Sequence, residues 1–177
     1  MATAAASQDV VLREIRPEDP VSGLSLGDPQ FTPLKTFLKK HARRYHTECL
    51  AKTYVYVTQG EQEKIVAYVS LICSQIEVSS GLPEVKEYEY SDLPAVKVAR
   101  LAVDSRNRGN DLGSKLVALA TAIARNNVMP HVGCRFLVVD AKKDSVRFYE
   151  KCGFRLLDTP NNRKRSSPVM FLDLWKL

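Results

Sequence analysis

A polar turn that carries two arginines and is bounded by glycines is the part of this sequence best suited to chemistry. Residues 104–114 read DSRNRGNDLGS, between the apolar run 96–103 and a segment with apolar residues at helical spacing. A strand that enters a helix through such a turn leaves unpaired backbone N–H groups, and the helix dipole adds positive charge there. Arg106 and Arg108 favour an anion further. The pattern predicts a phosphate-binding turn.

The segments around this turn predict an α/β domain with a central, mixed sheet. The helix after the turn presents Leu116, Leu119, Ala120 and Ile123 on one face and is expected to end near residue 127. A surface loop is expected over 79–94 and a basic loop between the last two strands. The other expected strands are 10–15, 53–58, 64–78, 134–139, 154–157 and 168–175, and the other expected helices are 32–50 and 143–152. Mixed strands and helices in this order are typical of the α/β class.

Length and composition indicate one globular domain. The chain has 177 residues, of which 45% are hydrophobic and 26% charged. We expect a short disordered tail at 1–8 and a single domain over 9–177. No apolar run approaches the roughly 18 residues that a membrane span needs, and the first residues lack the pattern of a signal peptide. The sequence therefore predicts a cytoplasmic protein that does not enter a membrane.

The charge balance favours a polyanionic partner. The net charge is +6, and basic residues cluster at 35–44 and 161–165. Such clusters contact a phosphate cofactor or a nucleic acid, although each is also common as a solvated face.

The cysteines and histidines show no metal-ligand spacing, so no metal is expected. Cys73 and Cys134 lie in apolar strand-like runs and are interpreted as small core residues. Cys152 stands directly before Gly153, as at the end of a helix.

Two quoted stretches carry a family resemblance. ARLAVDSRNRGNDLGSKL and, further on, FLVVDAKKDSVRFYEKCGF resemble the pyrophosphate-binding motif and the FYEK-x-GF segment of the GNAT superfamily of N-acyltransferases. The likeness covers about residues 31–174. It implies the GNAT fold, a central mixed, mostly antiparallel sheet flanked by helices on both faces. It also implies an enzyme that moves an acetyl group from acetyl-CoA, used as co-substrate, to a primary amine.

The chemistry of acetyl transfer assigns roles to these residues. Backbone groups near Leu101, Ala102 and Val103 can pair with the pantetheine arm, and one N–H there can stabilise the oxyanion. By resemblance, Tyr149 protonates the leaving thiolate. The remaining cofactor-binding candidates are Arg106, Arg108, Gly109, Asn110, Asp111, Leu112, Gly113, Ser114 and Ser145.

The general base and the acceptor stay open at this point. Glu77, Glu87, Glu89 and Asp104 are candidates for the base. The acceptor amine can belong to a small molecule, a protein or an aminoacyl-tRNA. The segments FLKKHARR, AVKVARLAVD and VDAK before Phe148–Tyr149 also look like the GNAT toxins, which acetylate aminoacyl-tRNA. That hypothesis implies an antitoxin protein as a partner, and a homodimer is common among similar proteins.

One departure from the family pattern keeps a third hypothesis open. Aligned on Arg108 and Gly113, the usual middle glycine is Asp111. An aspartate there can cap the following helix and repel a diphosphate. The alternative is therefore a degenerate, non-catalytic basic binding module.

Overall fold

A computed structural model describes residues 9–77, 82 and 88–177 of the chain. Three sequence predictions fall outside that part. These are the disordered tail at 1–8, half of the surface loop expected over 79–94, and Glu87 as a candidate base.

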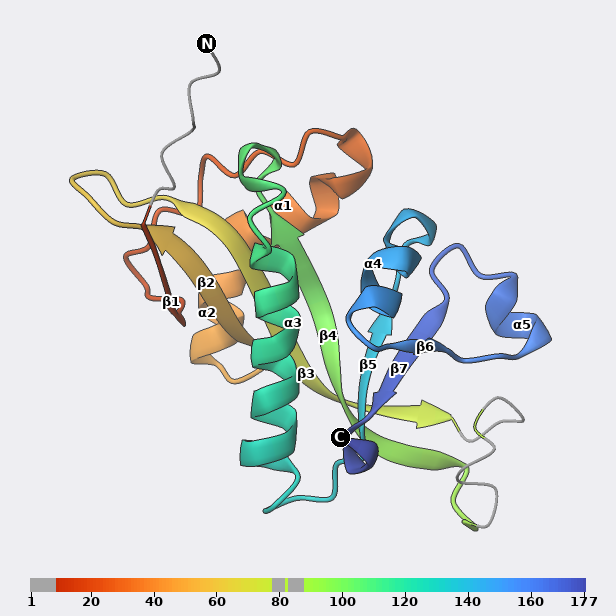
Figure 1. Ribbon diagram of the computed structural model, residues 1–177. Helices are drawn as coiled ribbons and strands as arrows, with labels where there is room; N and C mark the ends of the chain where they lie inside the picture. The colour runs from red at the N-terminus through yellow and green to blue at the C-terminus, as the bar shows by residue number, and fades with distance from the viewer. Residues whose placement is uncertain (1–8, 78–81, 83–87) are drawn as a thin grey trace. The chain divides into compact units, whose positions relative to one another are not determined.

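Seven strands form one sheet in the order β1-β2-β3-β4-β5-β7-β6 (Figure 1). The pairing of β4 with β5 is parallel, whereas β1 with β2, β5 with β7 and β6 with β7 are antiparallel. This confirms the predicted α/β fold with a mixed, mostly antiparallel sheet. The strands are β1 (Val10–Glu14), β2 (Lys52–Thr58), β3 (Ile65–Glu77), β4 (Asp92–Val103), β5 (Phe136–Asp140), β6 (Arg155–Leu156) and β7 (Val169–Asp173).

The α-helices differ from the predicted ones in several places. Helix α3 ends at Ile123, where a π-helical segment continues to Val128, and α4 begins only at Val146. The helix expected over 32–50 is divided at His41 and ends at Thr47. A short helix, α5, lies in the predicted basic loop, where Thr159 caps the N–H of Asn162 and Pro160 fills the first turn. Among the described residues, none of the helices is long and apolar enough to cross a bilayer. The α-helices are α1 (Thr32–Lys40), α2 (Ala42–Thr47), α3 (Leu112–Ile123), α4 (Val146–Lys151) and α5 (Pro160–Arg163).

Strand β4 is longer than predicted, because it begins at Asp92 instead of residue 96. Its recorded pairing with β5 covers Ala95 to Lys97, and the strand continues beyond that to Val103. Residues 92–94, of which Leu93 is buried, thus extend the strand at the expense of the predicted loop.

The contacts divide the chain into two compact units with separate cores. Unit 1 comprises residues 1–70 and 100–113, and unit 2 comprises 71–99 and 114–177. The buried cluster of unit 1 includes Leu24, Leu38, Val55 and Tyr68. The cluster of unit 2 includes Ile76, Leu93, Phe136, Val138 and Phe171. The predicted phosphate turn belongs to unit 1, and Tyr149 belongs to unit 2.

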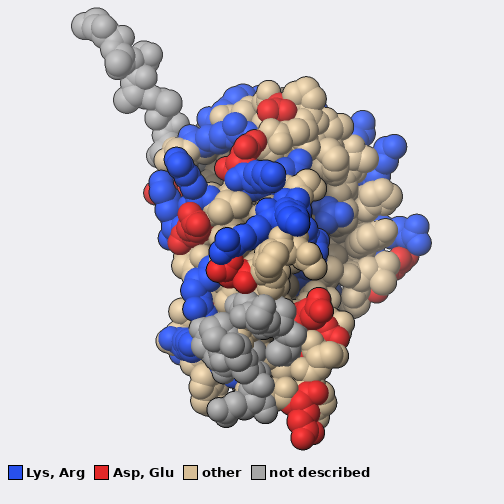
Figure 2. All heavy atoms as spheres, turned by 90° about the vertical axis from the view of Figure 1, so that its right-hand side faces the viewer, with Lys and Arg blue, Asp and Glu red and all other residues tan. Residues whose placement is uncertain are grey.

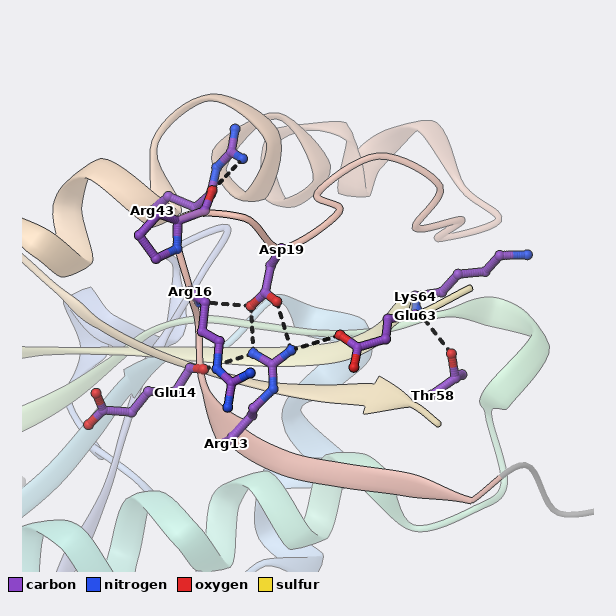
Figure 3. A network of polar contacts seen from close by, with 9 residues as sticks. Arg13, Glu14, Arg16, Asp19, Arg43, Thr58, Glu63 and Lys64 are labelled. Carbon is purple, nitrogen blue, oxygen red and sulfur yellow. Dashed lines mark hydrogen bonds and ion pairs between the residues drawn. The ribbon is translucent and has the colours of Figure 1, made fainter. Parts of the chain in front are cut away.

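A polar network fixes the start of unit 1 (Figure 3). Arg13 on β1 binds both carboxylate oxygens of Asp19 at 2.7 Å and also contacts Glu63 at 3.2 Å. The backbone N–H of Arg16 donates to Asp19 as well. Burial raises the pKa of Asp19, but the bonds from Arg13 and Arg16 outweigh it and leave that pKa below its ordinary value. The chain between β1 and α1 is therefore held at its first turn.

The cysteine predictions are confirmed in part. Cys134 is buried, as expected for a small core residue. Cys73 is exposed, so its prediction is wrong. The reason is that β3 is buried on both faces up to Leu71 and afterwards alternates between covered and open positions.

Candidate active site

The turn between β4 and α3 has a backbone suited to an anion. Gly109 and Asp111 both take left-handed conformations, with φ of 89° and 55°, and α3 begins at Leu112. Left-handed residues in such a turn direct successive N–H groups to one side, which forms a concave anion site. Residues 108–111 are exposed and accessible to a ligand. We expect this geometry to suit a diphosphate at 108–114.

A buried carboxylate anchors the start of this turn. Asp104 is 1% exposed and accepts hydrogen bonds from the Ser25 N–H at 2.9 Å and from the N–H, Nε and Nη2 of Arg106 at 2.7–2.9 Å. Burial raises the pKa of Asp104, but the Arg106 and Ser25 bonds overcome this and lower it to about 2. A carboxylate so firmly ionised and enclosed accepts no proton near neutral pH. Asp104 is therefore removed from the candidate bases.

A second loop, residues 23–27, clamps the turn, and sequence reasoning missed it. Ser105 N–H donates to the carbonyl of Ser25 at 2.7 Å. The side chains of Arg106 and Arg108 donate to the carbonyls of Gly23 and Leu26, at 3.1 and 2.7 Å. The glycine at 27 is required by close approach, because a Cβ there would lie 3.3 Å from that of Ser105 and its φ is 76°.

These contacts change the role expected for the two arginines. Arg106 forms an ion pair with Asp104, so its charge is largely balanced within unit 1. Arg108 uses one nitrogen for the Leu26 carbonyl. Both side chains therefore position the turn. The spaced glycines in SGLSLG at 22–27 were the only sequence signal for this clamp.

Asp111 does not cap α3. Its side chain is exposed, and among the described residues none donates a hydrogen bond to its carboxylate. Its φ of 55° explains instead why the family pattern has glycine at this place. Aspartate is one of the few other residues that tolerates this conformation. The expectation of a helix cap is thus wrong, while the negative charge beside the turn remains.

Asp111→Gly is expected to tighten acetyl-CoA binding about fivefold, roughly 1 kcal/mol, because a like charge leaves the diphosphate site. Stability should change by less than about 1 kcal/mol, since relief of the left-handed strain offsets the added chain entropy. Titration calorimetry and urea unfolding measure the two effects. Asp111→Asn is the matched control, which removes the charge alone and should tighten binding equally. Unaltered affinity in both variants would show that Asp111 has no influence on the cofactor.

Helix α4 in unit 2 holds Tyr149 in an aromatic cluster. The Tyr149 ring meets those of Phe148 and Phe154 edge-on, at centroid distances of 5.0 and 5.5 Å. The helix ends as predicted at Gly153, which has a φ of 90°. The Phe154 N–H returns to the Tyr149 carbonyl, which closes a Schellman turn. The FYEKCGF segment therefore fixes the ring by packing on one side and by its helix cap on the other.

The Tyr149 hydroxyl is available as a donor. The residue is 6% exposed, and burial raises the pKa of its phenol well above the ordinary value. Within the described part of the chain, no residue forms a hydrogen bond with this hydroxyl. Every side-chain oxygen that is fully buried in that part does have a hydrogen-bond partner, so the Tyr149 oxygen is not fully buried. The oxygen consequently reaches the surface of unit 2 as a neutral O–H group.

The remaining candidates are distributed over unit 2. Ser114 is exposed, and burial raises the pKa of the Cys152 thiol although Ser114 acts to lower it. Cys152 is thus a poor nucleophile. Ser145 lies just before α4, and its side chain does not cap that helix. Glu77 and Glu89 are exposed, and neither is assigned as a base.

The comparison with known families decides what this arrangement is. A family model described as "Acetyltransferase (GNAT) domain" matches residues 51–156, more than half of the chain. This chain belongs to the GNAT acetyltransferase family. The GNAT enzyme is an acetyl-CoA-dependent N-acetyltransferase, as the motifs at 99–116 and 136–154 predicted.

Known toxins are similar to this GNAT enzyme over most of their length. A tRNA-acetylating toxin of Mycobacterium tuberculosis is 28% identical over 149 residues, which cover 83% of this chain and 85% of the toxin. A crystal structure of a tyrosine mutant of KacT superimposes with a TM-score of 0.82 at 25% identity, covering 96% of this chain and 97% of KacT. AtaT complexed with acetyl-methionyl-tRNA superimposes with a TM-score of 0.81 at 22% identity, covering 95% and 96% of the two chains.

Proposed function

We propose that this GNAT enzyme transfers the acetyl group of acetyl-CoA to the α-amino group of an aminoacyl-tRNA. The observation that carries the proposal is the similarity to a tRNA-acetylating toxin along 83% of the chain. The net charge of +6 suits a polyanionic acceptor. Of the acceptors that the sequence left open, aminoacyl-tRNA is therefore favoured over a free small amine or a protein lysine.

The pKa of the acceptor amine agrees with this choice. A lysine amine has a pKa near 10.4 and needs a base to lose its proton, whereas an α-amino group has a pKa near 8. A sizeable fraction of an α-amino group is already neutral and nucleophilic at pH 7.5. With Asp104 locked in its ion pair, the described residues offer no enclosed carboxylate poised as a base. An aminoacyl acceptor needs none.

For the cofactor, the turn and the strand before it supply backbone groups. We assign the pantetheine arm to Leu101–Val103, where β4 continues beyond its recorded pairing with β5. The diphosphate is assigned to the N–H groups of 108–114, with the loop 23–27 holding the turn in shape. An N–H near Leu101 or Ala102 stabilises the oxyanion. Ser145 is retained as a contact to the cofactor.

Tyr149 is assigned as the donor to the leaving thiolate of coenzyme A. Because burial raises the pKa of its phenol, the group is protonated throughout the working pH range. It acts first as a hydrogen-bond donor to the developing negative sulfur and releases its proton late, since the coenzyme thiol has the lower pKa.

An antitoxin protein is proposed as a further partner. A structure of an AtaT mutant contains the C-terminus of the antitoxin AtaR together with acetyl-CoA. By similarity to that toxin, we expect this enzyme to be held inactive by a small partner protein.

The experiment that tests the proposal compares acceptors. The enzyme is incubated with radiolabelled acetyl-CoA and with charged tRNA, deacylated tRNA, a lysine peptide or a panel of small amines. We expect transfer to charged tRNA alone, with matching release of free thiol. Efficient acetylation of the small amines and none of charged tRNA would overturn the proposal.

Basic residues on helices α1 and α2 are proposed to dock the tRNA. Replacing them should impair reaction with charged tRNA and leave reaction with small amines unchanged. Replacing Lys39, Lys40, Arg43 and Arg44 by glutamine is expected to weaken tRNA binding and to flatten its salt dependence, because fewer counterions are released. Lys39 and Lys40 are exposed, whereas Arg43 binds the carbonyl of Pro17 and Arg44 binds Glu48. Binding is measured by filter retention at several salt concentrations. Thiol release without tRNA serves as the control, and an identical tRNA affinity in parent and variant would exclude this face.

A further inference from the structure

A pocket of about 650 Å³ lies in unit 2, and the proposed function does not use it. None of its lining residues belongs to the turn 104–114 or to α4. Its floor is apolar and includes Ile76, Val138 and Leu157. Its wall carries the ion pair between Lys97 and Asp140, whose atoms are 2.6 Å apart. Residues 159–162 and Arg165 form the rim. We call it the α5 pocket. An apolar floor below polar walls suits a flat, polar-edged group.

The rim of the α5 pocket is rigid because Asn162 fastens it. This side chain is 4% exposed and donates to the carbonyls of Leu157 and Val169, at 2.8 and 2.9 Å. It also accepts the N–H of Val169 at 2.8 Å. The side chain thus ties α5 to β7 and to the end of β6. A helix held in this way keeps its exposed side chains in fixed positions around the opening.

Those exposed side chains are basic. Arg163, Lys164 and Arg165 follow one another, and Arg155 adds a further charge on β6. Arg163 is paired with Asp158, and Arg165 lies 3.9 Å from Asp140, whereas Lys164 has no partner among the described residues. Figure 2 shows Lys and Arg side chains, with Asp and Glu among them, on the face on which α4 and α5 lie in Figure 1. The lining itself carries Glu77 and Asp140, which balance Lys97 and Arg165, so Lys164 beside the opening is the charge left to attract a phosphate.

We propose that the α5 pocket receives an unpaired nucleoside from the 3′ end of the RNA acceptor, while Lys164 and Arg165 contact its phosphates. The base covers the apolar floor and meets the exposed amide of Asn161 and the Lys97–Asp140 pair at its edge. This inference rests on the proposed function, since it places part of the same RNA. Phosphate contacts position the strand, and the base contributes the selective part.

The first test removes the rim charges. Lys164→Gln with Arg165→Gln should weaken binding of a 5′-fluorescein RNA oligonucleotide ending in CCA at least fivefold at low salt, and should lower the salt slope. Fluorescence anisotropy measures both. Arg125→Gln with Lys151→Gln is the matched control, because these two basic side chains are exposed in the same unit and line a different pocket. An equal loss in both double variants would show a general charge effect and would overturn the inference.

The second test addresses the base. An oligonucleotide of equal length with abasic sugars at its last three positions keeps every phosphate. The enzyme should bind it about tenfold or more weakly than the intact strand, as expected for one lost stacking contact. Asn161→Leu, which puts a branched side chain at the mouth of the pocket, should reduce this ratio. Equal binding of intact and abasic strands, or equal competition by a glutamate-rich peptide, would overturn the inference.

An assay with charged tRNA distinguishes a failure of the α5-pocket inference from a failure of the proposed function. If the parent enzyme acetylates charged tRNA and the rim variant does so with an unchanged KM, the α5 pocket is excluded and the proposed function stands. If the parent enzyme neither binds these strands nor acetylates charged tRNA, the proposed function itself fails.

Discussion

Replacing Tyr149 by phenylalanine is expected to lower kcat by about 10- to 1,000-fold, towards the lower end of the roughly 100- to 10,000-fold that general acid–base groups contribute. The substitution removes only the hydroxyl, so the ring still packs against Phe148 and Phe154. The leaving thiolate then departs without a donor, while acetyl-CoA affinity is little changed. A fall in kcat with a steady dissociation constant is the signature of an interaction made in the transition state.

The control for this variant is Tyr90→Phe, which makes the same chemical change at a tyrosine that is 74% exposed in the same unit. Thiol release with charged tRNA gives kcat, and calorimetry gives the affinity for acetyl-CoA. Because burial raises the pKa of Tyr149, the parent enzyme should show no activity loss from this group up to about pH 9. Turnover of Tyr149→Phe equal to that of Tyr90→Phe would reduce Tyr149 to a packing residue.

Asp104→Asn should destabilise the protein by about 2 kcal/mol at pH 7 and raise the KM for acetyl-CoA. The carboxylate accepts bonds from Ser25 and Arg106, and an amide would place its own N–H₂ against one of those donors. The turn 104–113 would then lose its anchor to the loop 23–27. Urea unfolding measures the stability, and initial rates at varied acetyl-CoA measure the KM.

The pH dependence of this effect has a definite sign. The pKa of Asp104 is lowered to about 2 in the folded protein, against 3.8 for the free side chain. Its contribution to stability is therefore complete above about pH 4 and is lost as the pH falls from 4 towards 2. The difference between parent and Asp104→Asn should be constant from pH 7 to 5 and clearly smaller at pH 3. A difference that grows on acidification would contradict the account.

The sequence predicted the elements that obey a simple periodicity or a strong stop signal. The strand into 104–112, the helix with Leu116 and Ala120 on one face, and the end of α4 at Gly153 all appear in the structure. Helix α5 was missed because four residues are too short for a helical period, although its Thr159–Pro160 start is a capping signal. The similar pair Thr32–Pro33 was also interpreted as a cap followed by the first helical residue, but α1 begins at Thr32 itself and its N-cap is Phe31. Cys73 was misplaced because β3 opens one face to solvent only beyond Leu71.

In the candidate site, the spacing of residues in the sequence indicated which residues belong to it, but not which residues they bind. Asp104 and Arg106 are two positions apart, and nothing in their order shows that the carboxylate is buried or that Ser25 binds it across 79 positions. The expectation that Asp111 caps α3 followed from residue type, whereas the backbone φ decides the matter. Long-range contacts of this kind depend on the folded chain and have no local signature.

The measurement that tests the central claim most directly is mass spectrometry of the terminal aminoacyl-nucleoside. Charged tRNA is treated with enzyme and acetyl-CoA and digested with nuclease, and the released nucleoside ester is fragmented. The account predicts a single acetyl group on the α-amino nitrogen of the amino acid. An unmodified aminoacyl group, or an acetyl group on the base or the ribose, would contradict it.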